Sequence, residues 1–148
     1  MFIKHRLLPW LLAATAGFVV ASVSHSQAVL YRLTALGIEI PLAVRLQSTW
    51  NDLVGLSPAY WPIIGVGLAI ALPCAGWLSG RWPSLRLALF MLAGFTAMAA
   101  ILLSMQPIME ITVVAGARGA LGMLAQCLSG AIAGAVFALT APPKFSGQ

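Results

Sequence analysis

The stretch LRLALFMLAGFTAMAAILLSM, residues 85–105, contains a single charged residue, Arg86, close to its start. A membrane hydrocarbon core about 30 Å thick requires about 20 consecutive apolar residues in a helix, and this stretch supplies them. In the whole chain 61% of the residues are hydrophobic and 7% are charged, against roughly 45–50% and 25% in soluble domains. Because so few charges cannot cover a water-facing surface, we expect most of the surface to face lipid.

Three further apolar runs are long enough to cross a membrane, so four transmembrane helices are predicted. The predicted spans are residues 7–26, 59–79, 85–106 and 113–141. Helices are expected because isolated strands would leave backbone groups without hydrogen bonds in lipid. The 148 residues therefore form one membrane domain, an all-α bundle of four transmembrane helices with a long loop at 27–58.

The first span has an alternative interpretation as a cleaved signal peptide. Lys4, His5 and Arg6 precede an apolar run, and Ser26-Gln27-Ala28 resembles a cleavage site with small residues at its ends. The run is longer than the apolar region of a signal peptide, about 7–15 residues, and three more spans follow it. We therefore expect a retained helix, with the cleaved form as the alternative.

The charges predict which ends of the spans face the cytoplasm. One side carries only basic residues, which are Lys4, Arg6, Arg81, Arg86 and Lys144. The other side carries both signs, from Arg32, Arg45, Arg118, Glu39, Asp52 and Glu110. The positive-inside rule therefore predicts a multi-pass protein of the cell inner membrane with both termini in the cytoplasm.

Aromatic residues at the two membrane interfaces are expected to follow the same orientation. The residues assigned to the inner interface are Trp10, Trp77 and Trp82. Those assigned to the outer interface are Tyr31, Trp50, Tyr60 and Trp61.

The outer loop, residues 27–58, is predicted to contain two short helices. Apolar residues recur at helical spacing from Val29 to Leu36, and Gly37 is expected to end that helix in a left-handed conformation. Ile40-Pro41 is typical of an extended residue followed by the first turn of a new helix.

The second short helix of this loop is predicted to be amphipathic and to end at Gly55. Its apolar stripe consists of Leu42, Leu46, Trp50 and Leu53. Arg45 and Asp52 lie on the opposite side, and Ser57-Pro58 is expected to begin the second span. Such a helix is expected to lie on the outer membrane surface or to cover the bundle as a lid.

Two glycine pairs predict close packing of helices. Gly76-x-x-x-Gly80 ends the second span, and Gly130-x-x-x-Gly134 lies in the fourth. Small residues at this spacing let two backbones approach each other in lipid, where no hydrophobic effect drives helices together. The partner is a helix of the same chain or of another copy.

The sequence contains no motif for catalysis, a cofactor or a metal. Cys74 and Cys127 form no C-x-x-C pair, and the first span separates the two histidines, His5 and His25. Gln126 is expected to form an interhelical hydrogen bond. The basic residues are scattered rather than clustered, so no nucleic-acid partner is expected. We expect neither an enzyme nor a resident cofactor.

Arg118 is the basic residue that the topology explains least. It opposes the positive-inside preference, and it lies at the start of a helix, where the helix dipole disfavours a cation. We expect an ion pair at the outer surface with Asp52, Glu110 or Glu39. The alternatives are a contact with an anionic lipid or substrate head group and simple snorkelling of the side chain.

Two functions remain compatible with these patterns. The first is a structural or accessory subunit that packs with partner membrane proteins or with itself in the bilayer. The second is a carrier or binding protein for a lipid or another apolar molecule, with the outer loop as a lid and Arg118 as the head-group contact.

Overall fold

The computed structural model describes residues 4–109 and 120–142. The long helices are α1 (Lys4–Ala35), α2 (Leu42–Ser79), α3 (Arg86–Met109) and α4 (Ala120–Thr140), and a short 3₁₀ helix, η1 (Pro83–Leu85), precedes α3. No strand occurs in this part of the chain. Each long helix contains a segment long and apolar enough to cross a membrane, so the prediction of four such helices is confirmed.

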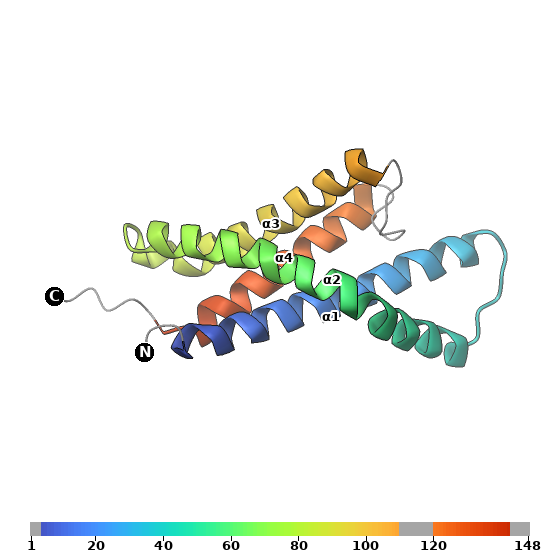
Figure 1. Cartoon of the computed structure of the whole chain (residues 1–148). Helices are drawn as coiled ribbons and strands as arrows, with labels where there is room; N and C mark the ends of the chain where they lie inside the picture. The colour runs from blue at the N-terminus through green and yellow to red at the C-terminus, as the bar shows by residue number, and fades with distance from the viewer. Residues whose placement is uncertain (1–3, 110–119, 143–148) are drawn as a thin grey trace.

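The four helices form a closed bundle in which successive helices run in opposite directions (Figure 1). α1 packs against α2 and α4, and α3 packs against the same two helices. The start of α1, the turn between α2 and α3 and the end of α4 lie at one end, which we call the base. We call the opposite end, where α3 ends and α4 begins, the mouth.

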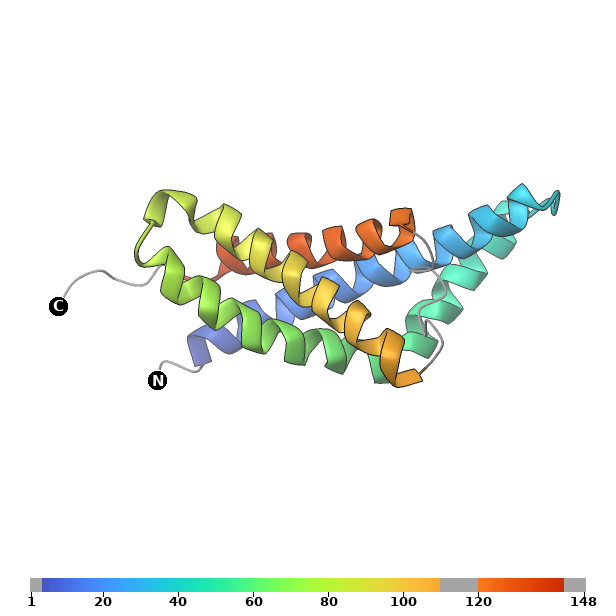
Figure 2. The same ribbon diagram turned by 90° about the horizontal axis from the view of Figure 1, so that it is seen from above.

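The hairpin of α1 and α2 extends beyond the mouth (Figures 1 and 2). α1 has 32 residues and α2 has 38, whereas α3 has 24 and α4 has 21. At about 1.5 Å per residue, α1 and α2 are roughly 48 and 57 Å long, and α3 and α4 are roughly 36 and 32 Å long. The surplus length of the first two helices forms the projection.

The two short helices predicted within residues 27–58 are not separate, because α1 continues to Ala35 and α2 begins at Leu42. The predicted helix ends are correct at Gly37 and wrong at Gly55. Gly37 has a φ of 85° and follows the end of α1, as expected for a left-handed stop. α2, however, continues through Gly55 and through Ser57-Pro58. A glycine in a helix interior costs only about 1 kcal/mol, so tertiary packing can keep the helix intact. Pro58 leaves the carbonyl of Val54 without its helical partner, and the Ser57 hydroxyl donates to that oxygen at 3.0 Å.

α2 changes direction near its middle, in the teal-to-green stretch of Figure 2. This stretch contains Pro58 and Pro62. Each proline lacks a backbone N–H and its ring crowds the preceding turn, which is the usual cause of a bend in a helix. The bend separates the projecting part of α2 from the part that packs against α3.

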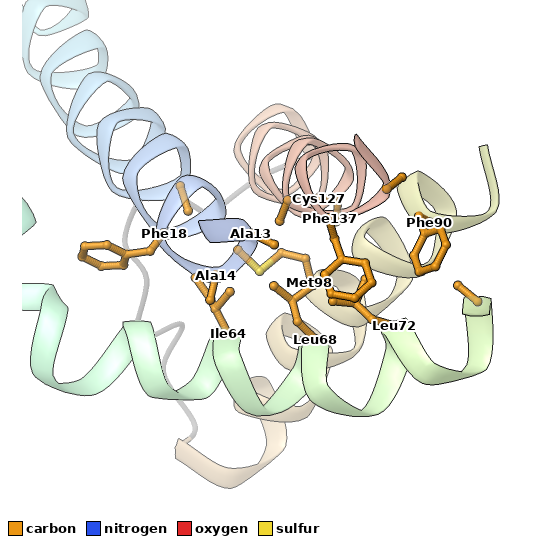
Figure 3. Packing of buried hydrophobic residues seen from close by; sticks show 14 of the residues in the cluster. Ala13, Ala14, Phe18, Ile64, Leu68, Leu72, Phe90, Met98, Cys127 and Phe137 are labelled. Carbon is orange, nitrogen blue, oxygen red and sulfur yellow. The ribbon is translucent and has the colours of Figure 1, made fainter. Parts of the chain in front are cut away.

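Side chains from all four helices fill the interior of the bundle (Figure 3). The residues labelled there are Ala13, Ala14, Phe18, Ile64, Leu68, Leu72, Phe90, Met98, Cys127 and Phe137. At the base, the Arg86 guanidinium donates to the carbonyl oxygen of Ala141 at 2.7 Å and lies 5.7 Å from the centre of the Phe90 ring. A cation at a helix C-terminus is favourable, so Arg86 ties α3 to the end of α4.

Trp10 and Trp61 cannot lie at opposite interfaces, so that part of the aromatic prediction is wrong. Their ring centres are 6.3 Å apart in an edge-to-face arrangement. The Trp10 indole donates to the carbonyl oxygen of Gly65, and the Trp61 indole donates to the Thr15 hydroxyl. The reason is the length of α2: because the helix begins at Leu42 rather than near residue 59, Trp61 lies well inside it.

Candidate functional site

Polar side chains gather on the inward faces of α1, α2 and α4. Five buried residues of this kind are Ser22, His25, Ser26, Gln126 and Ser129. Buried polar groups are costly in an apolar bundle unless they find partners, so their arrangement identifies the candidate site.

The deeper part of the site joins three helices through Gln126 of α4. The Tyr60 hydroxyl of α2 donates to Gln126 Oε1 at 3.0 Å, and Gln126 Nε2 donates to the carbonyl oxygen of Ala21 in α1 at 2.9 Å. Tyr60 is 3% exposed and Gln126 is 1% exposed. The interhelical hydrogen bond predicted for Gln126 is thus confirmed. In a low dielectric these bonds strengthen the bundle only while both ends are satisfied.

The outer part of the site centres on the carboxylate of Asp52. The Ser26 hydroxyl donates to Asp52 Oδ2 at 2.7 Å, and it also lies 3.1 Å from the carbonyl oxygen of Ser22. A hydroxyl has one proton, and the short distance to a charged acceptor favours the carboxylate. His25 is also buried, one residue before Ser26.

Ser22 lies between these two parts on α1 and differs from the other buried polar residues. Its side chain is fully buried, and its hydroxyl oxygen has no hydrogen-bond partner among the described residues. Ser22 is one helical turn before Ser26 and adjacent to Ala21, whose carbonyl accepts from Gln126. An unsatisfied hydroxyl at such a position costs about 1–3 kcal/mol, and therefore requires an explanation.

The projecting part of α2 turns its polar side toward α1. The Arg45 guanidinium and the Gln27 amide each form a long hydrogen bond of 3.4 Å across the hairpin, to Thr34 and Thr49. Apolar side chains next to this polar side are exposed. Leu42, Leu46 and Trp50, which we call the outer stripe, are 72%, 65% and 65% exposed. Leu53, the fourth member of the predicted stripe, instead packs against the buried core.

The structure brings only some of the predicted ion-pair candidates together. Asp52 lies in the polar site, Arg45 faces Thr34, and Glu39 is exposed in the connection between α1 and α2. Arg118 and Glu110 fall outside the described residues. The pairing of Arg118 with an acid therefore stays a prediction.

The glycines of the predicted packing motifs lie in different environments. Gly130 and Gly134 face α3, and an added Cβ would overlap the carbonyl oxygens of Gly94 and Phe90, respectively. Gly76 is buried at an ordinary contact distance from the Phe90 ring, whereas Gly80 is exposed at the end of α2. Gly94 of α3 completes the seam with α4, and sequence analysis missed it because it has no second glycine at a spacing of four.

An apolar groove runs between α2 and α3 on the outside of the bundle. Its volume is about 740 Å³, and small residues such as Gly67, Ala97 and Ala100 line it. Its two hydroxyl-bearing residues, Thr96 and Ser104, donate to carbonyl oxygens of their own helix. The groove therefore suits an apolar occupant.

Comparison of the chain with protein-family models, curated proteins and solved structures gives no match.

Proposed function

We propose that this chain is a non-catalytic accessory subunit of the inner membrane that packs against a partner membrane protein or a second copy. The observation that carries the proposal is the outer stripe of Leu42, Leu46 and Trp50. It is apolar and largely exposed, and it lies on the part of the hairpin that extends beyond the mouth. An exposed apolar surface of this kind is typical of an interaction site.

The arrangement of polar groups supports the same proposal. Three side chains of the projecting hairpin, Ser26, Gln27 and Arg45, donate hydrogen bonds across it between α1 and α2. Its outer side offers side chains that gain free energy by leaving water, at roughly 25 cal/mol per Å² of apolar surface. A tryptophan surrounded by aliphatic side chains is a common anchor in protein interfaces.

Site-directed crosslinking in native membranes tests this proposal. A photoreactive amino acid at Leu46 or Trp50 should give a discrete protein adduct, and a tagged and an untagged copy in one cell distinguish self-association from a different partner. Leu139, which is 77% exposed near the base, is the matched control. Products from Leu139 alone, or only lipid adducts from Leu46 and Trp50, would contradict the proposal.

The proposed orientation has both termini in the cytoplasm. It is supported by Arg6, Arg81 and Arg86, which belong to the segments at the base and have no acid near them in the sequence. A reporter fused after Gln148 should be active on the cytoplasmic side, and one inserted near Ile38 on the opposite side. A periplasmic C-terminus would contradict a retained first span.

A second candidate is a binding protein for a lipid or another apolar molecule, and the groove between α2 and α3 supports it. Its lining is apolar, and its hydroxyl groups are already used within α3. Native mass spectrometry of the detergent-extracted chain should then detect a retained lipid that Ala100→Phe displaces. Ala88→Phe, at an exposed position near the start of α3, is the control. Equal retention in both variants would exclude the groove as the binding site.

A further inference from the structure

We propose that Asp52, Ser26 and Ser22 form a binding site for a monovalent metal cation at the mouth of the bundle. The inference is independent of the proposed association through the outer stripe. It rests on three features: a carboxylate that faces α1, a serine hydroxyl bonded to it, and a second, fully buried serine hydroxyl that has no partner among the described residues.

Asp52 lies at the edge of the apolar part of the bundle, where its side chain is half buried. Ser26, which contacts it, lies 20 residues after Arg6, or about 30 Å along α1, which is the thickness of a hydrocarbon core. The carboxylate therefore lies where water gives way to lipid and protein. A half-buried carboxylate at this boundary is stabilised by hydrogen bonds and by a nearby cation. Arg45, two turns earlier in α2, directs its guanidinium to Thr34.

The oxygen atoms around Asp52 suit a small hard cation. Carboxylate and hydroxyl oxygens are preferred ligands of such ions, whereas softer metals select sulfur and imidazole. Ser22 and Ser26 are one turn apart on the same face of α1, and Ser26 contacts both Asp52 and the Ser22 backbone. A cation held by the carboxylate and both hydroxyls would give Ser22 the partner that it lacks.

The charge of the site selects a monovalent ion. One carboxylate supplies a single negative charge, so Na⁺ or K⁺ neutralises it, whereas a divalent ion would leave excess positive charge in a low dielectric. His25, which is buried one residue before Ser26, adds no negative charge to the site.

Thermal unfolding of the full chain in detergent, followed by tryptophan fluorescence, tests the site. NaCl and KCl are compared with choline chloride at equal ionic strength, because choline is too large for the site. At about ten times its Kd, the bound ion should raise the Tm by roughly 3–6 °C over choline. The ion that gives the larger rise is the preferred ligand.

Four variants distinguish binding from a general salt effect. In Asp52→Asn and Ser22→Ala, the Tm in NaCl or KCl should no longer exceed the Tm in choline chloride. Glu39→Gln, which removes an exposed carboxylate, and Ser24→Ala, which removes a neighbouring hydroxyl, should keep the rise over choline. Ser22→Ala removes a single oxygen atom, so it decides the question even if Asp52→Asn does not fold.

Three results would overturn the proposal. One is an equal Tm in all three salts. Another is a rise that persists in Ser22→Ala or Asp52→Asn. The third is a Ser22→Ala variant that melts above the wild type in every salt, because the hydroxyl would then be merely unsatisfied and its removal stabilising.

Discussion

The seam between α3 and α4 and the hairpin of α1 and α2 hold two helices together in different ways. In the seam, Gly94, Gly130 and Gly134 bring two backbones so close that no Cβ fits between them. In the hairpin, polar side chains bridge the helices, and Ser26 and Asp52 form the shortest of these hydrogen bonds, at 2.7 Å. The seam is stabilised by close packing of two backbones, and the hairpin is stabilised by hydrogen bonds between side chains.

This difference predicts different responses to substitution. A close backbone contact loses many van der Waals interactions at once when a side chain separates the helices. A polar bridge loses one or two hydrogen bonds, and its cost depends on which partner is left unsatisfied. Glycine substitutions in the seam should therefore have the largest effects on stability, and changes in the hairpin smaller ones.

The largest effect is expected for Gly134→Leu. The side chain would overlap the backbone of Phe90, so the free energy of unfolding should fall by at least about 3 kcal/mol. Because Gly134 faces α3 of the same chain, the loss should appear as a lower Tm in detergent at an unchanged oligomer size. An unchanged Tm would show that the seam does not exist.

An intermediate effect is expected for Gln126→Leu, which removes the link between the seam side of the bundle and the hairpin. The buried Tyr60 hydroxyl would lose its oxygen acceptor and keep the weaker contact of 3.8 Å with the Met98 sulfur, at a cost of about 1–3 kcal/mol. Adding Tyr60→Phe should recover part of the lost free energy of unfolding, because it removes the hydroxyl that Gln126→Leu leaves unsatisfied. Strictly additive effects of the two substitutions, measured by thermal unfolding, would mean that the two side chains do not interact.

The smallest effect is expected for Gly55→Ala, and the informative result is whether the Tm rises or falls. Gly55 lies inside α2, and an added Cβ would meet no atom within 4 Å. Alanine should therefore stabilise the chain by about 0.5–1 kcal/mol, seen as a slightly higher Tm. A lower Tm would indicate that the helix ends at Gly55 in a left-handed conformation, as the local pattern predicts.

Only part of the candidate site could be predicted from the sequence. Asp52 and Gln126 stand out in the sequence as polar residues in apolar surroundings, but their partners do not. In the sequence, Ser26 belongs to a possible cleavage site, and Ser22 is one of several small residues in the first span. The available signal was the spacing of Ser22, His25 and Ser26, which places all three on one face of a helix.

The four apolar helices and the stop at Gly37 could be predicted from the sequence, because span length, hydropathy and a left-handed glycine are local properties. By contrast, the continuation of α2 through Gly55 and the contact of its polar side with α1 depend on tertiary packing. Local propensities at a glycine or a proline are worth a few kcal/mol at most, and packing along a whole helix outweighs them. Which residues meet across two helices depends on their relative register, and no local pattern in the chain specifies it.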